Sequence, residues 1–194
     1  MRIIKSGILF LFLGLLALTV IAQEQKIEWV KKGTTLTYDV KYLETNYQFI
    51  VKIINLKPDV VFTWEMTEPQ SSSGKVNMSK EALATAIKQN NFFKSGELFL
   101  TDMTTVWVSK KVFSSIKKGK PILIDLLNEE ANLKFVKLEK KTFLIDGVKT
   151  KNIEVLYAET DSNQKYWILD CPEFPIILKM DLGWSIDIKS VETK

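Results

Sequence analysis

The chain has 194 residues, of which 27 are basic, 23 are acidic and none is histidine. Arg2 is the only arginine, so the guanidinium forks that bind phosphate and base edges are missing, and the nearly balanced charge leaves no electrostatic footprint for nucleic acid. The absence of histidine excludes Ser-His and Cys-His catalysis and histidine-ligated zinc. We therefore expect no catalytic residue, no metal or cofactor, and no nucleic acid partner.

Residues 1–22, MRIIKSGILFLFLGLLALTVIA, have a basic start followed by an apolar run. The run is shorter than the ~20 apolar residues of a membrane-spanning helix, and Val20 and Ala22 are small enough for a signal-peptidase site. We expect cleavage before Gln23, which makes residues 23–194 a single β-rich domain of an exported protein, periplasmic or extracellular. An uncleaved membrane anchor is the alternative.

Three segments early in this domain alternate apolar and polar residues: 34–42 (TTLTYDVKY), 46–54 (NYQFIVKII) and 59–66 (DVVFTWEM). A period of two residues with one polar face is typical of an antiparallel sheet that has one wet side. The turns between these segments are short, so we expect an up-and-down meander.

Two short helices are expected in the middle of the chain. Ser79 is suited to cap a helix over residues 80–89, and Ser109 a second helix that ends at Gly119. Short strands are expected between them, at residues 96–102 and 104–109. The apolar faces of the helices are Ala82, Leu83, Ala86 and Ile87 in the first and Val112, Phe113 and Ile116 in the second.

The last part of the chain returns to strand patterns. Asp146-Gly147 stands between two strand-like runs, which is the strongest short-range signal for a hairpin. The segments KYWILD, PIILKMD and WSIDIKSVE complete about nine strands. We predict an α+β fold that is mostly antiparallel β, with a single curved or half-barrel antiparallel sheet and two short helices on its concave side.

The end of the chain, roughly residues 140–191, resembles a group of exported bacterial proteins similar to the lipoprotein-carrier (LolA-like) folds. The resemblance rests on YWILD, FPIILKMDLGW and the Asp-Gly hairpin. It implies a curved antiparallel sheet that wraps around helices and a location in the bacterial envelope, and it implies no reaction. The lipoprotein carriers also use an arginine, which residues 23–194 lack.

About nine strands offer more inward apolar surface than two short helices cover, so we expect a cavity between sheet and helices. Its expected ligand-binding residues are Phe62, Trp64, Met66, Trp107 and Phe113. Ligand pockets are mostly apolar, so the favoured function is a non-catalytic envelope protein that binds a lipid-like small molecule or an envelope partner protein. A structural or protein-binding module without ligand is the first alternative, and a small carboxylate-dependent hydrolase is the second.

Lys110, Lys111, Lys117 and Lys118 surround the apolar face of the second expected helix. A basic amphipathic helix can contact an anionic membrane surface transiently. A solvated lysine face on a core helix is the alternative.

Cys171 is the only cysteine, so the chain has neither an internal disulfide nor a thiolate metal site. Pro172 biases Cys171 toward an extended backbone. We expect Cys171 to be a structural residue at the end of a strand. A reactive thiol or an intermolecular disulfide is the alternative.

Overall fold

The computed structural model describes residues 27–127, 129–150 and 152–193, so the expected signal segment lies outside the described residues. The N-terminal part is a meander of four antiparallel strands, of which the alternation predicts the first three. Leu36 lies opposite Val51, and Val51 lies opposite Trp64, so the predicted inner faces form one continuous buried row. The four strands are β1 (Thr35–Tyr42), β2 (Thr45–Asn55), β3 (Val60–Met66) and β4 (Ser73–Met78).

The middle of the chain contains both helices. The hydroxyls of Ser79 and Ser109 accept hydrogen bonds from the third backbone N–H along, at 3.2 Å in each case, which confirms both predicted N-caps. The first helix is shorter than expected because Lys88 and Gln89 join the sheet. The elements are α1 (Lys80–Thr85), β5 (Lys88–Gln89), β6 (Gly96–Leu100), β7 (Met103–Thr104), α2 (Lys110–Lys117) and β8 (Ile122–Asp125).

The C-terminal half is again sheet, and its predicted hairpin is present. Asp146 and Gly147 have φ angles of 48° and 79°, the positive values that a tight two-residue hairpin turn needs at both central positions. The strands are β9 (Glu130–Lys141), β10 (Leu144–Ile145), β11 (Val148–Lys149), β12 (Ile153–Thr160), β13 (Lys165–Leu169), β14 (Ile177–Asp181) and β15 (Ser185–Glu192).

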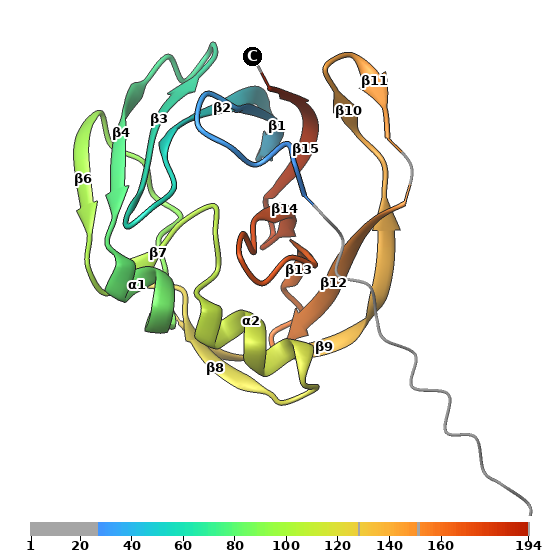
Figure 1. Ribbon diagram of the computed structural model, residues 1–194. Coiled ribbons are helices and arrows are strands. Elements are labelled where there is room, and N and C mark those ends of the chain that lie inside the picture. Colours follow the sequence, from blue (N-terminus) through green and yellow to red (C-terminus); the bar gives the residue numbers. More distant parts are fainter. Residues whose placement is uncertain (1–26, 128, 151, 194) are drawn as a thin grey trace, which may run out of the picture.

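All these strands belong to one sheet, which curves into a nearly closed barrel (Figure 1). The order along the sheet is β6-β4-β3-β2-β1-β15-β14-β13-β12-β9-β8-β5-β7, and the β10–β11 hairpin is attached to β15. The helices contact each other, and α2 packs on β8, β9 and β12 with its apolar side chains in the core. The mostly antiparallel α+β fold with helices on the concave side is therefore confirmed.

Two features differ from the expectation. The sheet is mixed, because β6 pairs in parallel with β4, β5 in parallel with β7 and β8, and β10 in parallel with β15. The chain passes through α1 and β5 between β4 and β6, so β6 returns beside β4 in the same direction. The described residues also form more strands than the nine expected, since several pairings are only two residues long and carry no periodic signal.

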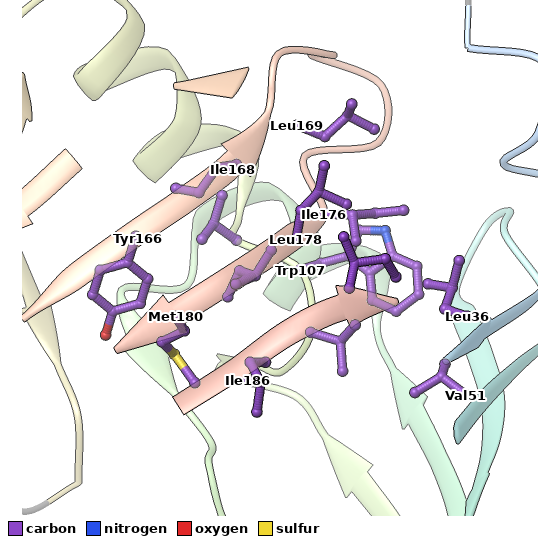
Figure 2. Close-up of a cluster of buried hydrophobic side chains, with 14 of the residues drawn as sticks. Leu36, Val51, Trp107, Tyr166, Ile168, Leu169, Ile176, Leu178, Met180 and Ile186 are labelled. Atoms are coloured by element: carbon purple, nitrogen blue, oxygen red, sulfur yellow. The ribbon is translucent and has the colours of Figure 1, made fainter. Parts of the chain in front are cut away.

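Residues 104–108 cross the interior of the barrel, and we call this segment the strap. It is held to the start of β14: the N–H of Ile177 donates to the carbonyl of Val106 at 2.7 Å, and the N–H of Val108 donates to Pro175 at 3.0 Å. Figure 2 shows Trp107 of the strap within the buried cluster, close to Ile176. Every residue of the strap is at most 5% exposed, so the strap is part of the core.

Candidate ligand-binding pockets

One pocket, which we call the apolar pocket, opens at the end of the barrel where β1 and β3 end. Its volume is about 50 Å³. Val40 and Tyr47 come from either side of the β1–β2 turn, and Met66 is the last residue of β3. The other apolar side chains of the wall are Phe49, Phe93, Val106, Ile177, Met180, Trp184 and Ile186.

Few polar groups reach the apolar pocket, and none of them is ionised near neutral pH. The side chain of Gln89 already accepts a hydrogen bond from Thr104 at 3.3 Å. Burial, with a smaller contribution from nearby Tyr42, raises the pKa of the Tyr47 hydroxyl above its usual value. Asn91 and Thr105 are the remaining polar residues of the wall. The pocket is thus a hydrophobic, uncharged site.

Two exposed apolar side chains lie next in sequence to segments that supply the wall of the apolar pocket, although neither lines it. Leu43 lies in the turn that joins Val40 to Tyr47 and is 84% exposed. Phe92 lies between the wall residues Asn91 and Phe93 and is 61% exposed.

A second pocket, which we call the lysine-rimmed pocket, lies at the opposite end of the same strands. Val60 begins β3 and lines this pocket, whereas Met66 ends β3 and lines the apolar pocket, a separation of roughly 20 Å along the strand. Phe174 and Pro175, which precede β14, form another part of the wall. The lysine-rimmed pocket has a volume of about 170 Å³.

The rim of this second pocket carries charge. Lys57 comes from the β2–β3 turn, Lys80 is the first residue of α1, and Lys110 is the first residue of α2. Glu173 is the acidic residue among those that line the pocket, and it forms an ion pair with Lys57. The two pockets therefore differ in charge although they share strands.

The strap separates the two pockets. Thr105 and Val106 line the apolar pocket, and Trp107 and Val108 line the lysine-rimmed pocket. Val106 has a φ of 62°, which is strained for a β-branched residue. The N–H of Thr105 donates to the sulfur of Met78 at 3.3 Å, a weak acceptor. The indole N–H of Trp107 is buried and has no hydrogen-bond partner among the described residues.

The structure distributes the expected ligand-binding residues over three places. Met66 lines the apolar pocket, and Trp107 lines the lysine-rimmed pocket. Phe62, Trp64 and Phe113 are at most 3% exposed, belong to the packed core and line neither pocket. Contacts between aromatic rings fill the space around these side chains. The ring centroids of Phe62 and Trp107 lie 5.6 Å apart, and those of Trp64 and Phe93 lie 5.2 Å apart. The middle of the alternating stripe is core, and its ends are pocket wall.

The lysines expected to contact a membrane also separate. Lys110 lines the lysine-rimmed pocket, and Lys117 pairs with the largely buried carboxylate of Asp170. Lys111 is exposed on α2, and Lys118 is exposed at the C-cap of that helix. Membrane contact by these residues stays a prediction.

Cys171 lies buried in the β13–β14 turn, which supplies Glu173 and Phe174 to the lysine-rimmed pocket. Its N–H donates to the carbonyl of Leu169 at 2.8 Å, and its carbonyl accepts from the N–H of Phe174 at 3.1 Å. The backbone of Cys171 therefore shapes the turn that presents the wall.

No family model, curated protein or solved structure matches the chain. Within the described residues, no helix has the length and apolar character needed to cross a membrane. The same part of the chain contains no group of three or more Cys, Asp or Glu side chains placed to hold a metal ion.

Proposed function

We propose that the protein is an exported, non-catalytic binding protein that takes a small apolar ligand into the apolar pocket. The observation that carries this proposal is the wall of that pocket, which is apolar on nearly all sides and has no group ionised near neutral pH. Transfer of an apolar group from water to such a wall is favourable by about 25 cal/mol per Å² of buried apolar surface. An ionic ligand would lose its hydration there without gaining a counter-charge.

The size of the pocket restricts the ligand. A dry cavity of about 150 Å³ binds benzene, and the apolar pocket measures about 50 Å³. In the described conformation it accommodates a short aliphatic group. Phe93 lies in the β5–β6 connection, outside any strand, and its ring centroid is 4.6 Å from that of Phe49. A larger ligand such as a lipid chain would require Phe93 to move away from Phe49.

The export of the protein is inferred from the sequence alone and is part of the proposal. The basic start and short apolar run of residues 1–22 favour a cleaved signal peptide. N-terminal sequencing of the protein purified from its native host should find Gln23 first. A membrane-bound form that keeps Met1 would contradict export by cleavage.

The binding proposal is tested with the neutral fluorophore N-phenyl-1-naphthylamine, whose two ring systems need more room than the described volume and enter only when Phe93 moves away from Phe49. Met66→Trp adds bulk at a half-exposed wall position. It should weaken saturable binding by about tenfold or more, because the added indole takes space that the ligand needs, and overfilling such a space costs about 1–3 kcal/mol. Glu65→Trp is the matched control, because Glu65 is the exposed neighbour that points to the other face of β3. Glu65→Trp should bind like the parent protein.

A second variant tests the same pocket in the opposite direction. Phe93→Ala removes part of the wall and should tighten binding of the same fluorophore. If neither the parent nor Phe93→Ala shows saturable binding, or if Met66→Trp and Glu65→Trp behave alike, the apolar-ligand proposal fails and a structural or protein-binding module replaces it.

A further inference from the structure

The lysine-rimmed pocket has an apolar floor and a charged entrance. The floor comes from the β2–β3 turn, β3, α1, the strap and the β13–β14 turn, which supply Leu56, Val60, Leu83, Trp107 and Phe174 in that order. The volume of about 170 Å³ is close to the cavity of about 150 Å³ that takes benzene. The floor therefore has room for an apolar group of about six carbons.

Three lysines from segments far apart in the sequence line this pocket: Lys57, Lys80 and Lys110. Glu173 forms an ion pair with Lys57, and both side chains are exposed. Lys80 lies 3.7 Å from Glu81, and these side chains are 69% and 65% exposed, so the pair holds Lys80 only weakly. The ion pairs formed among the described residues do not include Lys110.

Two acidic residues near the entrance, Asp59 and Glu81, do not line the pocket. The carboxylate of Asp59 accepts the backbone N–H of Lys80 at 2.9 Å, so it is engaged at the start of α1 and does not line the pocket. The first turn of α2 contains no acidic residue. Among the lysines of the pocket wall, Lys110 therefore has no acidic partner among the described residues, and Lys80 has only a weak one.

We propose that the lysine-rimmed pocket binds a monocarboxylate with a short apolar chain. The chain lies on the floor between Leu83 and Phe174, and the carboxylate accepts hydrogen bonds from the ammonium groups of Lys80 and Lys110. Charge-assisted hydrogen bonds of this kind are stronger than neutral ones. Glu173 at the same rim disfavours ligands with several negative charges, and the absence of arginine from the described residues removes the bidentate donor that phosphate groups favour.

This site is independent of the proposed function of the apolar pocket. The strap lies between the two pockets, and the residues that line one do not line the other. A failure of carboxylate binding leaves the apolar pocket untouched, and the reverse also holds.

The test is a calorimetric titration of the full chain with hexanoate, compared with hexan-1-ol and hexylamine. Hexanoate should bind saturably, hexan-1-ol about tenfold more weakly, and hexylamine not measurably, because the alcohol lacks the charge and the amine reverses it. Equal affinity for hexanoate and hexan-1-ol would overturn the role of the lysines. The absence of saturable hexanoate binding would overturn the site.

Two variants on the same helix turn provide the matched control. Lys110→Glu and Lys111→Glu make the same change in net charge, and both place an acid in the first turn of α2, where it stabilises the helix. Of the two residues, Lys110 lines the pocket and Lys111 does not. Lys110→Glu should weaken hexanoate binding by about tenfold or more, and Lys111→Glu by less than about threefold.

Lys80→Gln adds an independent check that does not depend on α2. It removes one proposed ammonium donor at an exposed position and should weaken hexanoate binding while hexan-1-ol binding stays unchanged. Equal effects of Lys110→Glu and Lys111→Glu would show attraction by net charge alone and would overturn the proposal. The same would follow if Lys80→Gln lowered the affinities for hexanoate and hexan-1-ol equally.

Discussion

The apolar pocket and the lysine-rimmed pocket are made by opposite ends of the same strands. The inward stripe of β3 runs from Val60 in one pocket, through Phe62 and Trp64 in the core, to Met66 in the other. The strands give both pockets an apolar floor, so the difference in charge comes from the connecting segments. At one end these bring Phe93 and Trp184, and at the other they bring Lys57, Lys80 and Lys110.

The strap makes the comparison sharper, because consecutive residues of one short segment serve different pockets. Val106 lines the apolar pocket and Trp107 the lysine-rimmed pocket. The positive φ of Val106 and the unpartnered indole N–H of Trp107 each lower stability. The core around the strap offsets these costs, so the strap is a partition held in place by packing.

The largest expected effect on stability comes from truncating the Trp107 side chain of the strap. Trp107 is 1% exposed and packs against Phe62, so Trp107→Ala should lower the free energy of unfolding by about 3–5 kcal/mol. Urea denaturation measures the change. Trp167→Ala is the control, because Trp167 lies on the outer face of the sheet beneath lysine side chains and is only half-buried. If Trp107→Ala lost less unfolding free energy than Trp167→Ala, the strap would not make the expected contribution to stability.

The next effect tests the strain at Val106. Glycine is normally about 0.5–1 kcal/mol less stable than alanine in regular structure. At a φ of 62° a Cβ atom costs roughly 1–2 kcal/mol, so Val106→Gly should be more stable than Val106→Ala. Val108 is not among the residues with positive φ, so Val108→Gly should be less stable than Val108→Ala. The same order at both positions would rule out strain in the strap.

The two pockets should also respond differently to pH. Tyr47 is the titratable side chain of the apolar wall, and burial raises its pKa above the usual value near 10. Tyr47 therefore stays neutral, and binding of the neutral fluorophore should be constant from about pH 5 to 9 and fall only at alkaline pH.

Hexanoate binding should instead fall as the pH drops through the ligand's own carboxyl pKa, which for such groups is about 4–5. Fluorescence and calorimetric titrations at a series of pH values measure the two profiles. Profiles of the same shape would mean that the pockets do not differ in charge as described.

The smallest effect is expected at Cys171. The turn is held by the backbone groups of Cys171, so Cys171→Ser should change the free energy of unfolding by no more than about 1 kcal/mol. Hexanoate affinity should stay within about twofold, because the substitution leaves the backbone hydrogen bonds in place. A loss of hexanoate binding, or a disulfide-linked dimer of the parent on non-reducing gels, would give the thiol a role of its own.

The fold was predictable where the signal is local. Alternation identified the inner faces of β1 to β3, Ser79 and Ser109 marked the helix starts, and Asp146-Gly147 marked a hairpin. The parallel pairings of β5 and β6 were not predictable, because strands of two to five residues have too short a pattern to show their partners.

The site was predictable only in part. Alternation along β3 shows that Phe62 and Met66 share a face, but it does not show that Phe62 meets Trp107 while Met66 reaches an open end. The lysine-rimmed pocket depends on Lys57, Lys80 and Lys110, which come together only when the β2–β3 turn and both helix starts meet in the folded chain. The spacing of these lysines in the sequence does not indicate that they line one pocket.

The most direct test of two separate pockets is a crossed titration of two variants with two ligands. Met66→Trp and Lys110→Glu are each titrated with N-phenyl-1-naphthylamine and with hexanoate. We predict that Met66→Trp weakens the fluorophore alone and that Lys110→Glu weakens hexanoate alone, each by about tenfold or more. If each variant weakened both ligands equally, or if the ligands competed in the parent protein, the two ends of the barrel would form a single site and the account would be contradicted.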